Sequence, residues 1–221
     1  MNAIIISVKP QWVEKILNGE KTIEIRKTKP QIELPCKVYI YCTRGQELWG
    51  DGTGETWYGI DENEDMQLVH ELNPTLARLN GKVVAEFTLN KVDKIGLADE
   101  FCNYGAWLFN EERYLHDKEK ERILKKSCLS MQELNDYLGY GDFETQQFAN
   151  GYAWHIDHLK IYDKPKELSE FKTYCSLVHN KKNVQCFSIL CRFKNECKDH
   201  LKPIIRPPQS WCYCNDLGDI E

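Results

Sequence analysis

Residues 7–27 read S-V-K-P-Q-W-V-E-K-I-L-N-G-E-K-T-I-E-I-R-K, a pattern that predicts a short helix, a stop and a strand. Pro10 suits the first helical position, because its missing N–H would be unpaired there in any case. Apolar residues then recur at helical spacing, namely Trp12, Val13, Ile16 and Leu17. Gly19 follows them, where a left-handed C-terminal cap favours a residue without Cβ. The helix is therefore expected over residues 10–18.

The strand expected after Gly19 alternates with period two. Ile23 and Ile25 share one face, so Glu24 and Arg26 share the other. Lys21 stands where the strand begins. Two interpretations are open: a solvated, salt-bridged strand face, or three charged groups that converge on a ligand.

The composition is typical of an ordinary globular protein. The 221 residues suffice for one large domain, or for one domain with a decoration. Hydrophobic residues make up 42% and charged residues 29% of the chain. The formal net charge of −5 argues against a protein that coats long polyanions, which would be basic. A small ligand or a few nucleotides is easier to reconcile with this charge.

The N-terminal apolar run, residues 3–6, is too short for a signal peptide and lacks a basic start. Apolar runs elsewhere are also shorter than a membrane span. We therefore expect a cytoplasmic protein. Its ten cysteines are then expected to be reduced, structural or metal-bound, because the cytosol disfavours disulfides.

Further elements follow from alternation and capping signals. Strands are expected at residues 3–7, 22–27, 36–42, 81–92, 152–162 and 206–214. Residues 111–126 are charged and predicted to be helical. Ser130 and Glu133 form a capping box that opens a second helix, and Gly139 is placed to end it. The apolar phase shifts within 152–162, which predicts a β-bulge near Asp157 and His158.

Several short strands, each followed by a turn or small helix, predict an α+β domain with a small bent sheet or barrel. The regular patterns break down over about 44–80 and 171–205. We expect a single domain over 1–221 with insertions at these two places, the second of them Cys-rich.

The opening segment resembles the signature of the ASCH-domain family, in the PUA-like superfamily. The resemblance rests on Lys9-Pro10, a short amphipathic helix, Gly19-Glu20-Lys21-Thr22 and Glu24-x-Arg26-Lys27. Segments 81–87, 152–156 and 206–211 resemble later strands of that family, in the same order. The chain is most similar to small uncharacterised ASCH proteins of Gram-positive bacteria and their phages.

The resemblance implies a PUA-like small mixed β-barrel, with short helices closing one side and a cleft lined by the Gly-x-Lys-x-x-Glu-x-Arg region. Related domains bind RNA, DNA or modified nucleosides there. One ASCH branch is an amidohydrolase that removes the acyl group from N4-acetylcytidine with a Lys, a Thr and a Glu. Its lysine corresponds to Lys21. Its threonine falls at Glu24, and its acid falls near Lys126 and Ser127, where this chain has no carboxylate.

The candidate ligand-binding residues are therefore cations, a carboxylate, an amide and aromatic rings: Lys9, Lys21, Glu24, Arg26, Trp154, Arg206, Gln209 and Trp211. Each has a plainer alternative: solvation for Lys9, an internal pair with Glu24 for Arg26, core packing for the tryptophans, and a Pro-Pro turn for Gln209. In an enzyme, Lys21 and Glu24 would be catalytic, with Glu24 as general base and Lys21 stabilising an oxyanion.

Histidines and cysteines give the competing signals. His155 and His158 flank the expected bulge, and we interpret them as satisfied structural histidines. The second insertion carries four cysteines followed by a histidine, namely Cys175, Cys186, Cys191, Cys197 and His200. These residues could hold a structural zinc, but they lack a Cys-x-x-Cys knuckle. No cofactor is predicted, and zinc is the open alternative to reduced thiols.

The sequence thus favours a protein that binds nucleic acid, RNA above DNA, or a modified nucleoside. The first alternative is an amidohydrolase of an acylated base. The second is a protein-interaction module of phage origin. No membrane partner is expected.

Overall fold

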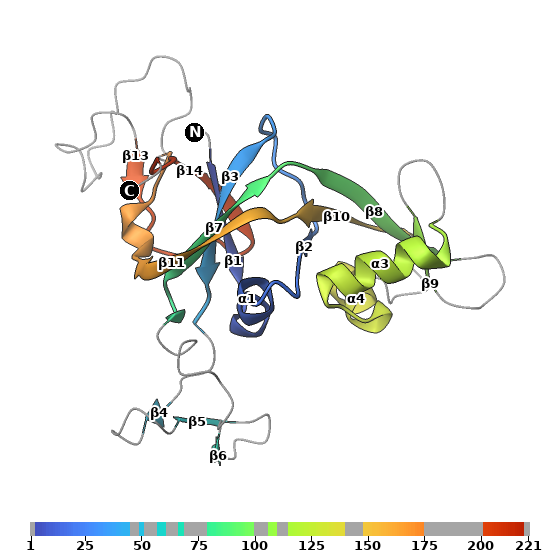
Figure 1. The fold of residues 1–221 in the computed structure, drawn as a ribbon, viewed down its shortest axis with the longest axis horizontal. Coiled ribbons are helices and arrows are strands. Elements are labelled where there is room, and N and C mark those ends of the chain that lie inside the picture. Colours follow the sequence, from blue (N-terminus) through green and yellow to red (C-terminus); the bar gives the residue numbers. More distant parts are fainter. Residues whose placement is uncertain are drawn as a thin grey trace. The chain divides into compact units, whose positions relative to one another are not determined.

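The computed structural model describes residues 3–44, 49–50, 57–60, 66–68, 79–99, 106–109, 115–139, 148–174 and 201–218. The strands in these ranges (Figure 1) are β1 (Ala3–Val8), β2 (Ile23–Arg26), β3 (Cys36–Cys42), β4 (Trp49–Gly50), β5 (Trp57–Ile60), β6 (Met66–Leu68), β7 (Val83–Leu89), β8 (Val92–Asp99), β9 (Ala106–Phe109), β10 (Phe148–His155), β11 (Asp157–Lys166), β12 (Lys172–Tyr174), β13 (Leu201–Pro203) and β14 (Trp211–Cys214). The helices are α1 (Pro10–Leu17), α3 (Asp117–Ser127), α4 (Met131–Leu138) and a 3₁₀ turn, η1 (Leu168–Glu170).

Contacts divide the chain into two compact units. Unit 1 comprises residues 1–13, 37–86 and 160–221, and unit 2 comprises 14–36 and 87–159. The single domain expected over 1–221 stays a prediction.

Unit 1 contains most of a five-stranded sheet with the order β11-β7-β3-β1-β14. β1 pairs in parallel with β3 and antiparallel with β14. Every residue of β1 is buried, which explains why its sequence is a continuous apolar run rather than an alternation. Its core includes Ile5, Tyr39, Val83 and Phe171.

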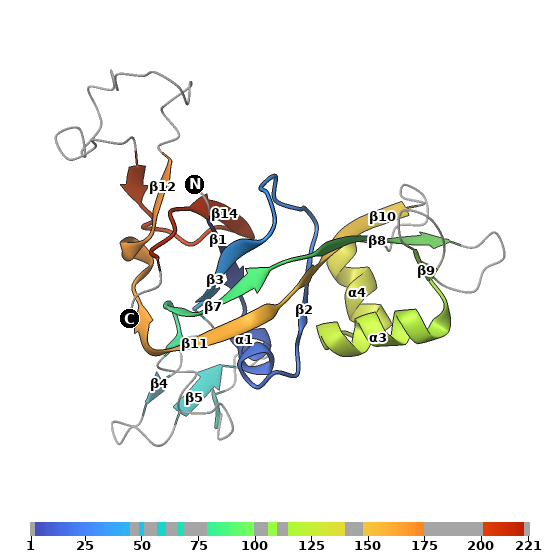
Figure 2. The ribbon, with the colours of Figure 1, turned by 45° about the horizontal axis from the view of Figure 1, so that its top comes forward.

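Unit 2 contains a four-stranded sheet with the order β2-β10-β8-β9, whose pairs are antiparallel. Helices α3 and α4 lie along one side of β8 and β10 (Figure 2). The core on that side joins alternate strand residues, such as Ile25, Ile95 and Ala153, to Leu134 and Leu138 of α4. The opposite face of the same strands carries Glu24, Arg26, Tyr152 and Trp154.

Local signals predicted the ends of α1 and α4 to within one residue. α1 begins at Pro10, and Gly19 adopts a left-handed φ of 76°. The side chain of Ser130 accepts the Glu133 N–H, and the Glu133 side chain accepts the Ser130 N–H in return. Gly139 ends α4 with a φ of 82°. α3 begins at Asp117 behind a His116 cap, so residues 115–116 of the predicted helix 111–126 are not helical, and residues 111–114 lie outside the described residues.

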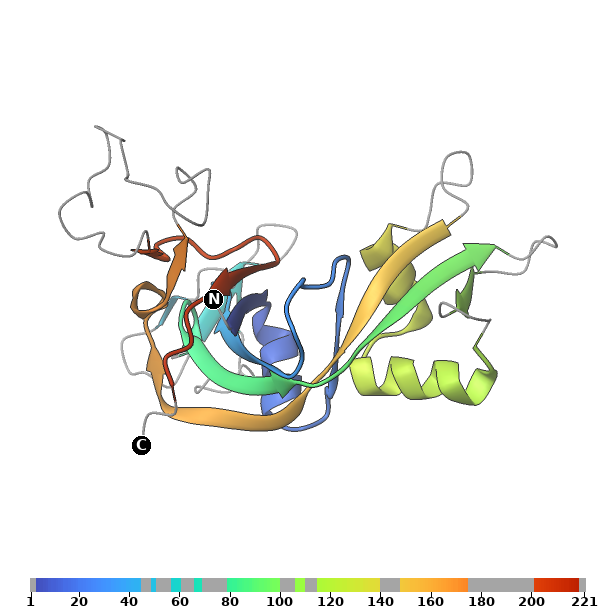
Figure 3. The ribbon, with the colours of Figure 1, turned by 90° about the horizontal axis from the view of Figure 1, so that it is seen from above.

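The α+β class is confirmed. In the described part of the chain the strands pair as open sheets, with no closed barrel among them. β7 and β11 run alongside each other, as do β8 and β10 (Figure 3). Between β10 and β11 the strand is interrupted at Ile156, and His158 has a positive φ of 49°. The one strand with a β-bulge that was predicted over 152–162 is thus divided into two strands, β10 and β11, at the place where the bulge was expected.

The two expected insertions are partly described. Within 44–80, β4, β5 and β6 form a small antiparallel sheet where the sequence predicted an irregular excursion. Within 171–205, β12 pairs with β13, and the cysteines and His200 proposed for zinc lie outside the described residues. No described helix is both long and apolar enough to cross a membrane.

Candidate functional site

Glu24 of β2 lies between two cations. Its Oε2 is 3.3 Å from Lys21 Nζ, and its Oε1 is 2.9 Å from a terminal guanidinium nitrogen of Arg26. All three residues are buried, with exposed fractions of 2% for Lys21, 7% for Glu24 and 5% for Arg26. We call these three residues the unit 2 charge network.

The C-terminal end of α3 holds Lys21 in place. Lys21 Nζ donates a hydrogen bond of 2.6 Å to the carbonyl of Ser127, the last residue of α3. Carbonyls at a helix C-terminus lack partners within the helix and carry partial negative charge, so an ammonium is favoured there. The Thr22 N–H also donates to the Lys126 carbonyl, and the Thr22 carbonyl accepts from the Ile156 N–H. The start of β2 is therefore fixed on both sides.

Burial of Glu24 and Arg26 corrects one of the two interpretations of β2. Ile23 and Ile25 form a buried face, as the alternation predicted. The opposite face is salt-bridged but it is not solvated, because Glu24 and Arg26 are buried as well. Removing several charges from water costs several kcal/mol per ion, which the pairing offsets in part. The internal pair between Arg26 and Glu24 is the alternative that the sequence had left open.

Trp154 is the uncharged neighbour of this network. It lies directly across from Glu24 in the pairing of β10 with β2, and its exposed fraction is 0%. The ring therefore packs in the interior and presents no face to a base. This placement matches the core-packing alternative.

The other predicted binding residues lie in unit 1. Lys9, Arg206 and Gln209 are exposed. Trp211 is half-buried, pairs with Ile6 in register and makes an edge contact with Tyr213, the ring centroids 5.3 Å apart. The turn before it is held by Ser7, whose hydroxyl donates to the Pro208 carbonyl at 2.7 Å. The backbone N–H of Ser7 donates to the Ser210 carbonyl. Lys9 follows Ser7 by two residues. The eight predicted residues thus divide into four in each unit.

His155 is paired, as expected for a structural histidine. Its Nε2 is 2.8 Å from Asp93 Oδ2, and Lys91 Nζ is 2.8 Å from the other carboxylate oxygen. Burial raises the pKa of Asp93, but hydrogen bonds from Lys91 and His155 outweigh it, so that the pKa lies below its ordinary value. This cluster ties the connection between β7 and β8 to β10.

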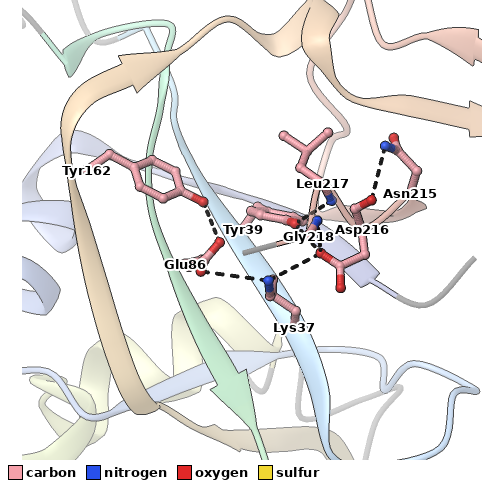
Figure 4. Close-up of polar contacts among 8 residues, drawn as sticks. All are labelled: Lys37, Tyr39, Glu86, Tyr162, Asn215, Asp216, Leu217 and Gly218. Carbon is pink, nitrogen blue, oxygen red and sulfur yellow. Dashed lines mark hydrogen bonds and ion pairs between the residues drawn. The ribbon is translucent and has the colours of Figure 1, made fainter. Parts of the chain in front are cut away.

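Unit 1 contains a second polar network, which the sequence analysis did not predict (Figure 4). Tyr162 donates to Glu86 at 2.6 Å, and Lys37 Nζ lies 3.8 Å from Glu86 and 3.3 Å from Asp216. Tyr39 donates to Asp216 at 2.7 Å. The network fastens residues 215–218, after β14, to β3, because Leu217 and Gly218 donate to Tyr39 and Asp216.

Several pKa values in this network depart from their ordinary range. Burial, followed by the bond to Glu86, raises the pKa of Tyr162. Burial is also the main cause of the raised pKa of Tyr39. Burial raises the pKa of Asp216. Hydrogen bonds from Tyr39, the Gly218 N–H and Lys37 together lower it by more than burial raises it, so the pKa lies below its ordinary value. The carboxylate is therefore held ionised by three donors.

Among the described residues, no group of three or more His, Cys, Asp or Glu side chains is arranged to hold a metal ion. The described cysteines are free thiols, and burial raises the pKa of Cys212 to about 11. A thiol of raised pKa is a poor nucleophile and a poor metal ligand.

No protein-family model and no curated protein matches the chain. Solved structures of ASCH proteins are similar to it, and ASCH is the family that the opening segment resembles. The similarity to proteins of Gram-positive bacteria and phages stays a prediction.

The particular structures come from Zymomonas mobilis. The ASCH protein has 15% identity, with 96% of this chain and 87% of that chain covered and a TM-score of 0.45. A serine-to-alanine mutant gives the same identity and coverage with a TM-score of 0.44, and a tyrosine-to-phenylalanine mutant has 16% identity, 76% and 77% coverage and a TM-score of 0.40. At these values the likeness is distant.

Proposed function

We propose that unit 2 binds RNA or a modified nucleoside at the charge network of Lys21, Glu24 and Arg26. The observation that carries this proposal is a buried carboxylate held between an ammonium and a guanidinium. An apolar set of the same volume would often be as stable or more stable than buried ions. Fold stability alone therefore does not explain why these three charges are buried together, and we infer a ligand role for them.

The residue types fit the polar groups of a nucleotide. A guanidinium recognises a phosphate or a paired carbonyl and ring nitrogen through two parallel N–H bonds, and an ammonium acts as a point charge on an oxygen. A carboxylate accepts from the exocyclic amine of a cytosine. A ligand of this kind would take up contacts that the three side chains now make with one another.

The contacts of Glu24 favour binding over hydrolysis. A general base needs a lone pair directed at the proton that it removes. Each carboxylate oxygen of Glu24 already contacts a cation, Lys21 on one side and Arg26 on the other. A water molecule would have to share these oxygens with the two cations. The amidohydrolase is thus the second candidate, supported by the contact of Lys21 with Glu24.

One experiment separates the two candidates. N4-acetylcytidine and a short single-stranded RNA are titrated against the wild type, Lys21→Ala and Lys118→Ala, and the nucleoside is followed in parallel by mass spectrometry. We expect binding of one or both ligands without deacylation, weakened in Lys21→Ala. Lys118 is an exposed lysine of α3, so Lys118→Ala should bind as the wild type does. Deacylation lost in Lys21→Ala would contradict the binding proposal and support the hydrolase. Binding of a protein partner unaffected by Lys21→Ala, with no ligand binding, would support the interaction module.

A further inference from the structure

Tyr152 of β10 is surrounded by positive charge on the face of the unit 2 sheet that lies opposite α3 and α4. In the strand register it lies directly across from Arg26 on β2 and from Lys94 on β8. Residues directly opposite in an antiparallel pair share a face, with Cβ atoms about 5 Å apart. Lys29 Nζ adds a third cation, 5.9 Å from the centroid of the Tyr152 ring.

The acidic groups on this face do not balance these cations. Among the described residues of β2, β8 and β10, Glu24 is the one carboxylate on the face, and it already contacts Lys21 and Arg26. Within the described part of the chain, neither Lys29 nor Lys94 forms an ion pair with a carboxylate. A local excess of positive charge is therefore present in a chain whose formal net charge is −5. Such an excess attracts an anionic ligand.

The degree of burial is suited to contact with a ligand. Tyr152 and Lys94 are half-buried, whereas Lys29 and Asn150 are exposed. Asn150 lies two residues before Tyr152 on the same strand, so its side chain belongs to the same face. The exposure of the residues on this face rises along β10, from buried at Trp154 through half-buried at Tyr152 to exposed at Asn150. A cation near an exposed aromatic ring contributes little to the stability of a fold, so stability alone does not explain this arrangement.

An aromatic ring flanked by cations is the chemistry that proteins use to hold single-stranded nucleic acid. A base stacks on the ring whatever its sequence, and lysines contact the neighbouring phosphates. An asparagine beside the ring can hydrogen-bond a base edge. A double helix fits poorly, because its bases are already stacked and paired. A free nucleoside fits only the ring and leaves the lysines without a phosphate.

We propose that Tyr152, with Lys29 and Lys94, is a stacking and phosphate-binding surface for a nucleotide of a single-stranded RNA. This inference rests on the proposed function, and it makes the substrate class a polynucleotide rather than a free nucleoside. The surface adds a second contact beside the charge network, on the same face of the same strands.

The test uses the full chain and an RNA octamer carrying one 2-aminopurine, whose fluorescence falls when it stacks. The variants are Tyr152→Phe, Tyr152→Leu, Lys29→Gln and Lys94→Gln, with Lys118→Gln as the charge-matched control from α3. We expect Tyr152→Leu to lower the affinity about 5- to 150-fold and to abolish the quenching, whereas Tyr152→Phe keeps both. Each lysine variant should lower the slope of log affinity against log salt by about 0.7, and Lys118→Gln should not.

The outcomes separate this inference from the proposed function. If the wild type binds the RNA and Tyr152→Leu, Lys29→Gln and Lys94→Gln bind it equally well, the surface is overturned while the charge network remains the site. If the wild type binds N4-acetylcytidine but not RNA, the inference is overturned and the proposed function stands. If the wild type binds neither, both are overturned. The lysine variants decide the matter even if Tyr152→Leu fails to fold.

Discussion

Glu24 is the residue on which the unit 2 network depends. Both of its carboxylate oxygens lie within ion-pair distance of a buried cation, Lys21 on one side and Arg26 on the other. Lys21 reaches the carbonyl of Ser127, which is 106 residues away along the chain. The alternation of β2 predicted which side chains share a face with Glu24. It could not predict that this face is buried, because β10, the strand that pairs with β2, comes from a distant part of the chain.

Removing one member of the unit 2 charge network is expected to lower the free energy of unfolding more than replacing all three members. Glu24→Ala leaves two buried cations and should lower the free energy of unfolding by about 3–5 kcal/mol. The triple variant Lys21→Met, Glu24→Leu, Arg26→Met replaces the ions with apolar groups, and should be within about 1 kcal/mol of the wild type or up to about 4 kcal/mol more stable. Urea unfolding measures both. A triple variant as unstable as Glu24→Ala would show that the ions are needed for the fold itself.

At the scale of elements, the predictions succeeded where the signal was local. α1 begins at Pro10 and is followed by Gly19, and α4 lies between Ser130 and Gly139, as predicted. These signals are local because caps and left-handed turns depend on a few adjacent residues. β8 was not predicted, because the strand expected over 81–92 ends at Val92, where β8 begins. Its residues include Asp93, Lys94 and Gly96, which interrupt an apolar alternation, so its strand state depends on pairing with β10 and β9.

The capping box of α4 gives a prediction at this scale. Ser130→Ala removes the hydroxyl that accepts the Glu133 N–H, and should lower the free energy of unfolding by about 1 kcal/mol. Gln132→Ala, on the same exposed turn, removes one side-chain contact with Asp136 and should cost only a few tenths of a kcal/mol. Thermal or urea unfolding compares the two. Equal losses in both variants would argue against the cap.

At the scale of the whole molecule, the chain holds two compact units, each with its own polar network. The sequence predicted the α+β class and the charged group at β2. It did not predict the network of Lys37, Tyr39, Glu86, Tyr162 and Asp216, because these residues come from four separate segments and each looks ordinary alone. Register between distant strands brings them together, and that register has no local signature.

Asp216 makes part of the stability of unit 1 dependent on pH. Its pKa is lowered in the folded chain, so the stability it contributes is present above its unfolded pKa of about 3.9 and is lost as the pH falls through the folded pKa. We expect the difference in unfolding free energy between the wild type and Asp216→Asn to be largest near pH 6 and to shrink below about pH 4. Asp163→Asn, which removes an exposed carboxylate of β11, is the matched control variant. A difference independent of pH would contradict the assignment.

The most direct test of the central claim is RNA binding by the wild type and by the triple variant Lys21→Met, Glu24→Leu, Arg26→Met. Fluorescence anisotropy of a labelled single-stranded RNA is measured at several salt concentrations, after circular dichroism has shown both proteins to be folded. The wild type should bind with an affinity that falls as salt rises, because phosphate contacts release counterions. The folded triple variant should lose most of this binding. Equal affinity in the two proteins would contradict a ligand role for the charge network of Lys21, Glu24 and Arg26.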